Sequence, residues 1–253
     1  MNLNNYLHYS QEFLASFFIF IFFAFISLKL FKPFFPISIA SDRSALSHAP
    51  TLRGIGIIFP FCLIISSNLF TQNYELFVSY YLLMFISALI GFYDDLKNID
   101  YVKKLSSLTF LFITIVLIDN DLLLLVDFNI FFSLIISLTL FLFFVLFFNQ
   151  IDGINGLSSG TFCIFFASLI FIKNNEMATT GIFLNILGIV LAYFILNVLQ
   201  IKVFQGDSGA YFLGSAAYLI YQENEEILFL SLVFLFPIIG DIIWTTIMRG
   251  YFR

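Results

Sequence analysis

Long apolar runs separated by short polar segments cover almost the whole chain. A helix that crosses the hydrocarbon core of a bilayer needs about 20 apolar residues, and fewer where neighbouring helices shield it. The pattern predicts an all-α integral membrane protein, a polytopic bundle of about nine transmembrane helices in a single domain over residues 1–253. The fourth, sixth and eighth runs are short, and the full set is 13–31, 53–70, 76–93, 105–118, 129–148, 157–172, 179–199, 208–221 and 227–247.

The composition supports the same class. Hydrophobic residues make up 61% of the chain and charged residues 11%, more apolar material than a soluble domain uses. The first run follows Glu12 without a basic segment before it or a small-residue cleavage site after it, so we interpret it as a retained span and not a signal peptide. The eighth run contains several small residues, which let helices approach closely, and it is expected inside the bundle.

Basic residues fix the predicted orientation. Cytoplasmic segments of membrane proteins are enriched in Lys and Arg. With the N-terminus outside, ten of the 11 Lys and Arg residues fall on the cytoplasmic side, and Lys173 alone falls outside. The sequence therefore predicts an outer N-terminus and a cytoplasmic C-terminus.

Four polar clusters fall on this predicted cytoplasmic face. They are the loop from Asp42 to Gly56, the segment Gly91-Phe92-Tyr93-Asp94-Asp95-Leu96-Lys97, the segment 149–157 and the segment Gly206-Asp207-Ser208-Gly209. The predicted outer loops have no comparable combination of glycine, carboxylate and amide residues. A further carboxylate, Asp241, interrupts the ninth apolar run, where it needs a partner.

Each cluster has a simpler explanation when taken alone. The two aspartates could end a membrane helix in a solvated loop, and Gly206–Gly209 could be a tight turn with a helix N-cap. Asn149, Asp152 and Asn155 recur every three residues and could form a polar helix end or one edge of a turn. In the first loop, Arg43, His48 and Arg53 could anchor the protein at the cytoplasmic surface.

Together the clusters favour a metal-dependent reaction on a phosphorylated substrate. Two adjacent carboxylates repel each other unless a proton or a cation lies between them. Mg²⁺ relieves such repulsion and is commonly held by one or two carboxylates and by substrate phosphates. Arg and Lys side chains assist by neutralising phosphate charge.

The order of the clusters resembles the polyprenyl-phosphate N-acetylhexosamine-1-phosphate transferase superfamily, glycosyltransferase family 4. This superfamily includes the phospho-MurNAc-pentapeptide translocase and the initiators of O-antigen and teichoic-acid synthesis. The resemblance covers residues 40 to 253. The segments that carry it are Ser47-His48…Pro50-Thr51-Leu52-Arg53-Gly54, Gly91 to Asp95, Asn149-x-x-Asp152-Gly153-x-Asn155-Gly156-Leu157 and Gly206-Asp207-Ser208-Gly209. Asn155 stands where the family usually has Asp, and Asp241 falls where the O-antigen-type branch has an intramembrane Asp.

The resemblance implies a reaction and roles for particular residues. N-acetylhexosamine-1-phosphate would move from a UDP-sugar to undecaprenyl phosphate, releasing UMP, in the first membrane step of a cell-envelope polysaccharide pathway. Catalysis would involve Asp94, Asp95 and Asp207. Mg²⁺, or Mn²⁺ in its place, would be held by Asp207 and Asp152. Substrate contacts would come from the residues Asn149, Asp152, Asn155, His48, Arg53 and Lys97.

The resemblance also implies a setting. The enzyme would lie in the bacterial cytoplasmic membrane with its active face toward the cytoplasm, and it would bind no nucleic acid. A homodimer is compatible with this setting. The family continues past the ninth span into a loop with a His motif and a further span, and we expect both to be missing here and activity to be impaired. An inactive remnant of a transferase is therefore one alternative, and a small-solute transporter is the other.

The orientation can be tested by cysteine labelling. We expect single cysteines placed near Lys103 and near Gln205 to react with a membrane-impermeant reagent only from the cytoplasmic side, and one near Asn224 only from outside, because of the Lys and Arg asymmetry. Labelling near Lys103 from the outer side would refute both the orientation and the shared site.

Overall fold

The computed structural model describes residues 3–38, 51–70, 77–123, 130–152, 156–172, 180–199 and 203–222, together with Gly240. Apart from Gly240, the predicted ninth span lies outside these residues, and so does Asp241. The predicted count of nine transmembrane helices, the orientation and the missing C-terminal elements thus stay predictions.

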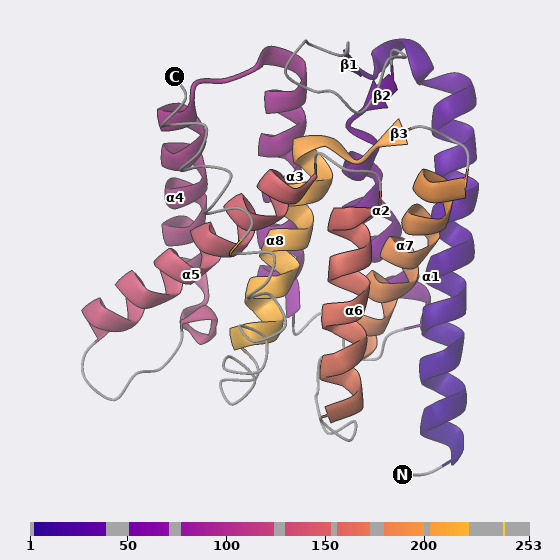
Figure 1. Cartoon of the computed structure of the whole chain (residues 1–253). Helices are drawn as coiled ribbons and strands as arrows, with labels where there is room; N and C mark the ends of the chain where they lie inside the picture. The colour runs from indigo at the N-terminus through magenta and orange to yellow at the C-terminus, as the bar shows by residue number, and fades with distance from the viewer. Residues whose placement is uncertain are drawn as a thin grey trace.

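The described part of the chain is a helical bundle with eight α-helices (Figure 1). They are α1 (Leu3–Leu30), α2 (Ile58–Phe70), α3 (Val78–Lys97), α4 (Tyr101–Ile118), α5 (Ile130–Ile151), α6 (Leu157–Ile172), α7 (Thr180–Leu199) and α8 (Gly206–Gln222). The short 3-10 helices are η1 (Lys32–Phe34), η2 (Ile55–Ile57) and η4 (Asn120–Leu122). Each α-helix overlaps one of the first eight predicted spans. Among the described residues, 4 helices are long and apolar enough to cross a membrane, namely those over His8–Leu30, Tyr101–Ile118, Ile130–Ile151 and Thr180–Leu199.

One feature departs from the all-α prediction. Three short strands, β1 (Ile37–Ser38), β2 (Thr51–Arg53) and β3 (Val203–Phe204), form a small sheet in the order β1-β2-β3 at one end of the bundle (Figure 1). The β1–β2 pair is antiparallel and the β2–β3 pair is parallel. The sequence pattern missed the sheet because two- and three-residue strands are too short to show a period of two.

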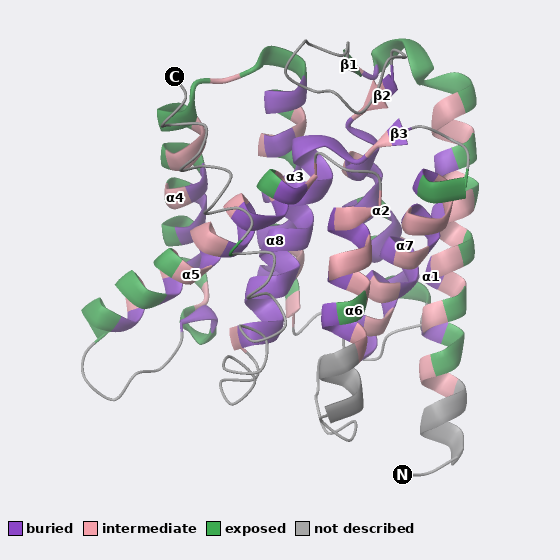
Figure 2. Ribbon diagram, in the orientation of Figure 1, coloured by how far each residue is buried: buried purple, intermediate pink, exposed green. Residues whose placement is uncertain are grey.

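Helix α8 forms the centre of the bundle. It packs against α3 on one side and α5 on another, while α1 packs against α7 and α2. Every residue of α8 from Gly206 to Tyr221 is buried, whereas α1, α4 and α5 expose much of their surface (Figure 2). The prediction that this short, small-residue segment lies inside the bundle is confirmed. Its small residues are needed because a Cβ atom on Gly214 would overlap the backbone of Val145 in α5.

The ends of two helices differ from the predicted limits, and this changes how the acids are held. Helix α3 continues to Lys97, so Asp94 and Asp95 belong to its last turns and are buried there. They do not lie in a solvated loop. Helix α5 ends at Ile151, which leaves Asn149 in the helix and Asp152 in the turn that follows it.

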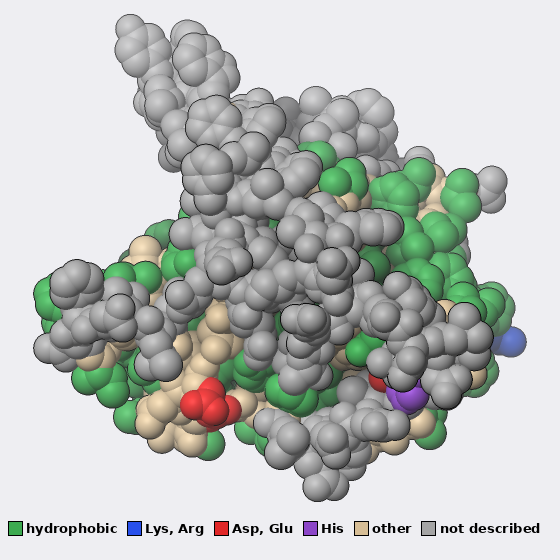
Figure 3. Space-filling view, turned by 90° about the horizontal axis from the view of Figure 1, so that it is seen from below, with side chains coloured by type: hydrophobic (Ala, Val, Ile, Leu, Met, Phe, Trp, Pro, Cys, Tyr) green, Lys and Arg blue, Asp and Glu red, His purple; other side chains and the backbone are tan. Residues whose placement is uncertain are grey.

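The opposite end of the bundle is held by hydrogen bonds between α3, α8 and the segment after α4. The Tyr218 hydroxyl donates to the Leu122 carbonyl at 2.5 Å, and the Tyr80 hydroxyl donates to Gln222 at 2.8 Å. Ser79 donates to Asp119. On this face, the described atoms are mostly hydrophobic or uncharged, with small groups of acidic side chains, a histidine and a basic side chain at one edge (Figure 3).

The close approach of α8 and α5 gives a stability prediction. We expect Gly214→Ala to lower the free energy of unfolding by roughly 1–3 kcal/mol, because the added methyl group must push two packed backbones apart. Gly160→Ala in α6 is the matched control, since its Cβ would meet the ring of Phe194 at 3.2 Å and not a backbone. Thermal unfolding in detergent measures the stability of both variants. Equal melting temperatures for the two would contradict the packing argument.

Candidate active site

The Asp95 carboxylate joins helix α3 to the beginning of helix α8. One oxygen accepts a hydrogen bond from the backbone N–H of Asp207 at 3.0 Å, and the other accepts one from Ser208 at 3.2 Å. The side chain thus caps the N-terminus of α8, where a negative charge is favourable. The approach requires Gly206, whose φ is 73° and whose Cβ atom, if present, would overlap this carboxylate.

Arg53 connects the same two helices through the small sheet. Its Nε lies 2.8 Å from Asp95 Oδ1, and its terminal nitrogen pairs with Asp207. The sheet positions the guanidinium because Arg53 is opposite Phe204 in the parallel β2–β3 pair. Two more backbone bonds continue this connection, from Gly54 to Phe204 at 3.1 Å and from Gly56 to Gln205 at 3.0 Å. A single cation therefore bridges carboxylates that are far apart in sequence.

Lys104 supplies a second cation to the cluster. It comes from the first turns of α4, and its ammonium group pairs with Asp94 and lies 3.7 Å from Asp207 Oδ2. The chain can reverse between α3 and α4 because Asn98 adopts a left-handed conformation with φ 47°. Asp94 supports that turn by accepting a hydrogen bond from the backbone N–H of Ile99 at 2.8 Å.

Asp94 and Asp207 form a coupled pair of carboxyl groups at the helix ends. Burial raises the pKa of Asp207 to about 7, and the nearby Asp94 carboxylate acts in the same direction by favouring protonated Asp207. The pKa of Asp94 is lowered in spite of its burial, because Asp207, Lys104 and the Ile99 N–H all donate hydrogen bonds to it. The pair therefore holds a proton more readily on Asp207 than on Asp94.

The pKa values of Asp95 and Arg53 are shifted by the same surroundings. Burial raises the pKa of Asp95, and the Arg53 charge and the two backbone hydrogen bonds act against this. Burial alone would lower the pKa of Arg53, but the charges of Asp207, Asp95 and Asp152 raise it. Arg53 is therefore held in its charged form by three carboxylates.

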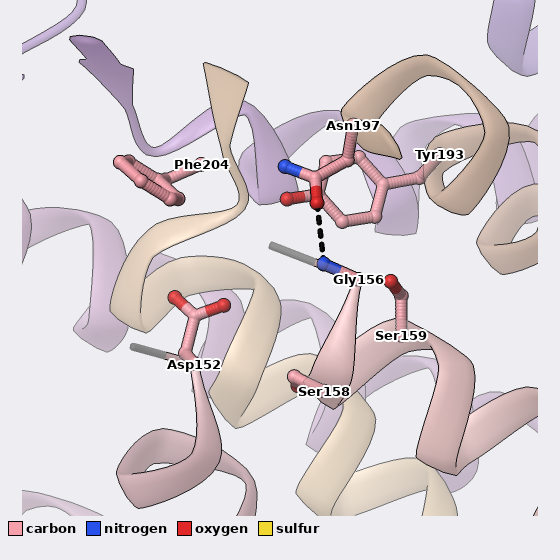
Figure 4. Close-up of a pocket in the computed structure, with 7 residues that line it drawn as sticks. All are labelled: Asp152, Gly156, Ser158, Ser159, Tyr193, Asn197 and Phe204. Atoms are coloured by element: carbon pink, nitrogen blue, oxygen red, sulfur yellow. Dashed lines mark hydrogen bonds between the residues drawn. The ribbon is translucent and has the colours of Figure 1, made fainter. Parts of the chain in front are cut away.

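A small pocket adjoins this cluster at the ends of α5 and α6 (Figure 4). It has about 160 Å³ of empty space, part of which is open to the outside, and its lining residues are Asp152, Gly156, Ser158, Ser159, Tyr193, Asn197 and Phe204. Asn197 closes one side by accepting a hydrogen bond from the Gly156 N–H at 2.7 Å and donating to the Val203 carbonyl at 2.8 Å. Figure 4 shows the Asp152 carboxylate on the side of the pocket below the Phe204 ring.

Gln205 connects the pocket to the carboxylate cluster. Its backbone N–H donates to the Tyr193 hydroxyl at 2.7 Å, and its side-chain amide donates to Ser158 at 2.8 Å. Asp152 interacts with the Gln205 side chain and with the charges of Arg53 and Asp207. The third and fourth sequence clusters are therefore parts of one continuous polar site.

The structure brings together most of the predicted site residues that it describes. Asp94, Asp95, Asp152, Asp207 and Arg53 are connected as above, and Asn149 is next to the cluster in the last turn of α5. Lys97 differs, since it is exposed at the end of α3 and forms no ion pair with a described acidic residue. His48 and Asn155 lie outside the described residues.

The sequence did not indicate two parts of the site, the cation Lys104 and the pocket residues on α7. Lys104 was counted only among the cytoplasmic basic residues, although it follows the aspartate pair closely enough for a tight turn to fold it back. The pocket residues Tyr193 and Asn197 lie in an apolar run and gave no signal. Asp95 was expected to take part in catalysis, and in the structure its two oxygens are occupied by α8 and Arg53.

Comparison with known proteins places the chain in a family. A family model described as "Glycosyl transferase family 4" matches residues 77–223. The chain is 30% identical over 192 residues to a Sulfolobus acidocaldarius protein that carries the name UDP-N-acetylglucosamine–dolichyl-phosphate N-acetylglucosaminephosphotransferase, an alignment that covers 69% of this chain and 58% of the relative. It is 37% identical over 81 residues to the phospho-N-acetylmuramoyl-pentapeptide-transferase of Bacillus cytotoxicus, covering 30% of this chain and 25% of the relative.

The match to the first relative therefore spans little more than half of that protein's length. The family match itself covers more than half of this chain and includes three of the four polar clusters, those on α3, α5 and α8. Together with the apolar helices, it identifies an integral membrane protein. The chain belongs to glycosyl transferase family 4, the superfamily of polyprenyl-phosphate N-acetylhexosamine-1-phosphate transferases that its motifs resemble.

Proposed function

We propose that this protein transfers N-acetylhexosamine-1-phosphate from a UDP-sugar to a polyprenyl phosphate, undecaprenyl phosphate in a bacterium, and releases UMP. The observation that carries the proposal is the convergence of Asp94, Asp95, Asp207, Arg53 and Lys104, from four different elements, at one end of a membrane helix bundle. That end would face the cytoplasm, where nucleotide sugars are available, and the bilayer would supply the lipid substrate.

The reaction is a phosphoryl transfer. An oxygen of the lipid phosphate attacks the phosphorus that carries the sugar, the bond from that phosphorus to the bridging oxygen breaks, and UMP leaves with that oxygen. The second pKa of a phosphate monoester is about 6, so most of the acceptor has already lost its proton near neutral pH. The main task of the site is therefore to hold highly charged groups together, as in other phosphoryl transfers.

Arg53 and Lys104 provide the positive charge for this task. Each is held in place by carboxylates, so its position is set before a substrate arrives. Preorganised cations stabilise developing phosphate charge without reorganisation during the reaction. Asp94 is the group we assign to accept any remaining proton, because its lowered pKa keeps it ionised, while Asp95 holds α8 and Arg53.

The described residues fit a Mg²⁺ ion that is shared with the substrate. Four carboxylates face two basic side chains here, and this excess of negative charge would repel a diphosphate unless a further cation were bound. Among the described residues no three acidic, His or Cys groups could hold a metal by themselves. Mg²⁺ needs fewer protein ligands than that, since it is often held by one or two carboxylates and by substrate phosphates.

Asp207 and Asp152 are the protein ligands that we assign to this ion, Asn149 in the last turn of α5 is a third, and Mn²⁺ would be an alternative metal. The Lys104 ammonium group lies close to both Asp94 and Asp207. These carboxylates therefore already have a cation beside them. When bound, the ion would neutralise phosphate oxygens as a Lewis acid. The protein's own residues would hold and orient it.

We assign the nucleotide part of the donor to the polar surface around the neighbouring pocket. An aromatic ring, Phe204, lines it together with hydroxyl, amide and carboxylate groups, and nucleobases are bound by stacking on aromatic rings and by hydrogen bonds to their edges. The first relative is named for UDP-N-acetylglucosamine, so a UDP-N-acetylhexosamine without a peptide arm is the donor class we propose.

The direct test uses purified protein in detergent with Mg²⁺, undecaprenyl phosphate and either UDP-GlcNAc or UDP-GalNAc. UMP release and the mass of the lipid product are measured together. Formation of a lipid-linked HexNAc diphosphate with one UMP per lipid supports the proposal. A full donor screen, including UDP-MurNAc-pentapeptide, that yields no UMP would leave the remnant alternative as the better description.

The role of Asp207 predicts a large loss on removal of its charge. We expect Asp207→Asn to lower the rate of UMP release about 100-fold or more without lowering the melting temperature, because the change is nearly isosteric and removes a buried charge. Asp100→Asn is the control, since Asp100 is an exposed acid on the same face whose partner is Lys103 at 3.3 Å. Near-parental activity of Asp207→Asn would exclude it as a metal ligand.

Lys104 can be tested against its neighbour in sequence. Hydrogen bonds to charged groups contribute about 1.5–3 kcal/mol, so Lys104→Gln should lower kcat/KM for the UDP-sugar by roughly ten- to a hundredfold. Lys103→Gln should have little effect, because Lys103 is exposed and pairs with Asp100 outside the cluster. If the two variants have the same kinetics, Lys104 does not contact the substrate phosphates.

A further inference from the structure

A buried tyrosine in α8 adjoins the active-site cluster without a structural explanation. Tyr211 lies one helical turn after Asp207, so the two side chains are on the same face of α8. Its side chain is 0% exposed, and within the described residues its hydroxyl has no hydrogen-bond partner that meets ordinary geometric limits. Leaving a buried hydroxyl unsatisfied is energetically unfavourable, so a function for this group is expected.

The groups around the Tyr211 hydroxyl are those of the proposed metal site. The Asn149 side-chain amide is close enough to interact weakly with the hydroxyl, and the charges of Asp207 and Asp94 also act on it. Asn149 is in the last turn of α5, which packs directly against α8. The hydroxyl is therefore influenced by an amide and by carboxylates that come from three different helices.

A second buried tyrosine of the same helix shows the contrast. Tyr218 is also 0% exposed, and its hydroxyl donates a hydrogen bond to the Leu122 carbonyl at 2.5 Å. That bond connects two structural elements at the other end of the bundle. Tyr218 is thus a structural residue with a satisfied hydroxyl, whereas the Tyr211 hydroxyl forms no hydrogen bond of ordinary geometry with the described residues.

The chemistry of an asparagine ligand explains what a phenol could do at this position. A cation binds the amide through its oxygen, so the amide nitrogen, which has two N–H donors, must face an acceptor. A tyrosine hydroxyl can accept such a bond and at the same time donate its own proton to a carboxylate or a water molecule. It would thereby fix the amide with its oxygen toward the cation.

We propose that Tyr211 is a positioning residue for the divalent cation: its hydroxyl holds the Asn149 amide so that the amide oxygen and the Asp207 carboxylate face the same ion. The inference rests on the proposed function for the presence of the ion. It assigns to Tyr211 no contact with the substrate or with the metal itself.

The test compares Tyr211→Phe with Tyr218→Phe, two changes that each remove one oxygen from α8. The affinity for Mn²⁺, measured by electron paramagnetic resonance of the purified protein with UDP-GlcNAc present, is the primary readout, and the melting temperature is the second. Loss of a group that orients a metal ligand typically weakens metal binding 10- to 100-fold. We expect such a loss for Tyr211→Phe, with no decrease in melting temperature. Tyr218→Phe should bind Mn²⁺ normally and melt at a lower temperature.

A double-mutant cycle shows whether the effect passes through Asn149. In an Asn149→Ala background, Tyr211→Phe should cause no further loss of Mn²⁺ affinity, because the amide that it positions is gone. Additive losses, an affinity of Tyr211→Phe within twofold of the parent, or a parent protein that binds no Mn²⁺ would each overturn the inference. Absence of UMP release from a parent that binds Mn²⁺ would instead contradict the proposed function, and the affinity comparison would still decide the role of Tyr211.

Discussion

The bond between the Asp95 carboxylate and the first turn of α8 is the interaction on which the rest of the site depends. Buried backbone N–H groups at a helix start need acceptors, and α8 begins inside the protein with no solvent to supply them. Asp95 provides two acceptors from the end of α3. The two helices can come this close because Gly91 and Gly206 have no side chains at the contact.

That one bond determines the position of the charges. By fixing α8 against α3, it places Asp207 next to Asp94, and the repulsion that results is relieved by Arg53 and Lys104. Burial keeps these interactions strong, because the effective dielectric constant is lower there than in water. A cluster of four acids is therefore stable only with cations among them. The same requirement makes the cluster suitable for a divalent ion and a diphosphate substrate.

The small sheet positions Arg53 at the carboxylate cluster. It connects the segment after α1 to the strand before α8, and so it holds Arg53 on the cluster from a part of the chain far away in sequence. The backbone bonds from Gly54 and Gly56 extend the connection to the residues directly before α8. Without the sheet, the segment that carries Arg53 would lack its backbone hydrogen bonds to the strand before α8.

The sequence by itself determined the class of protein, the first eight helices and the family. Apolar runs of the right length show a membrane bundle, and the small residues of the eighth run placed it inside. Motif order identified the family and most of the acids, since Asp94, Asp95 and Asp207 stand in short local patterns. Four features came only from the tertiary structure: the sheet, the capping role of Asp95, the ion pairs of Lys104 with the aspartate cluster, and the position of Tyr211. The physical reason is that each depends on contacts between residues distant in the chain, and a local pattern of apolar and polar positions carries no information about such contacts.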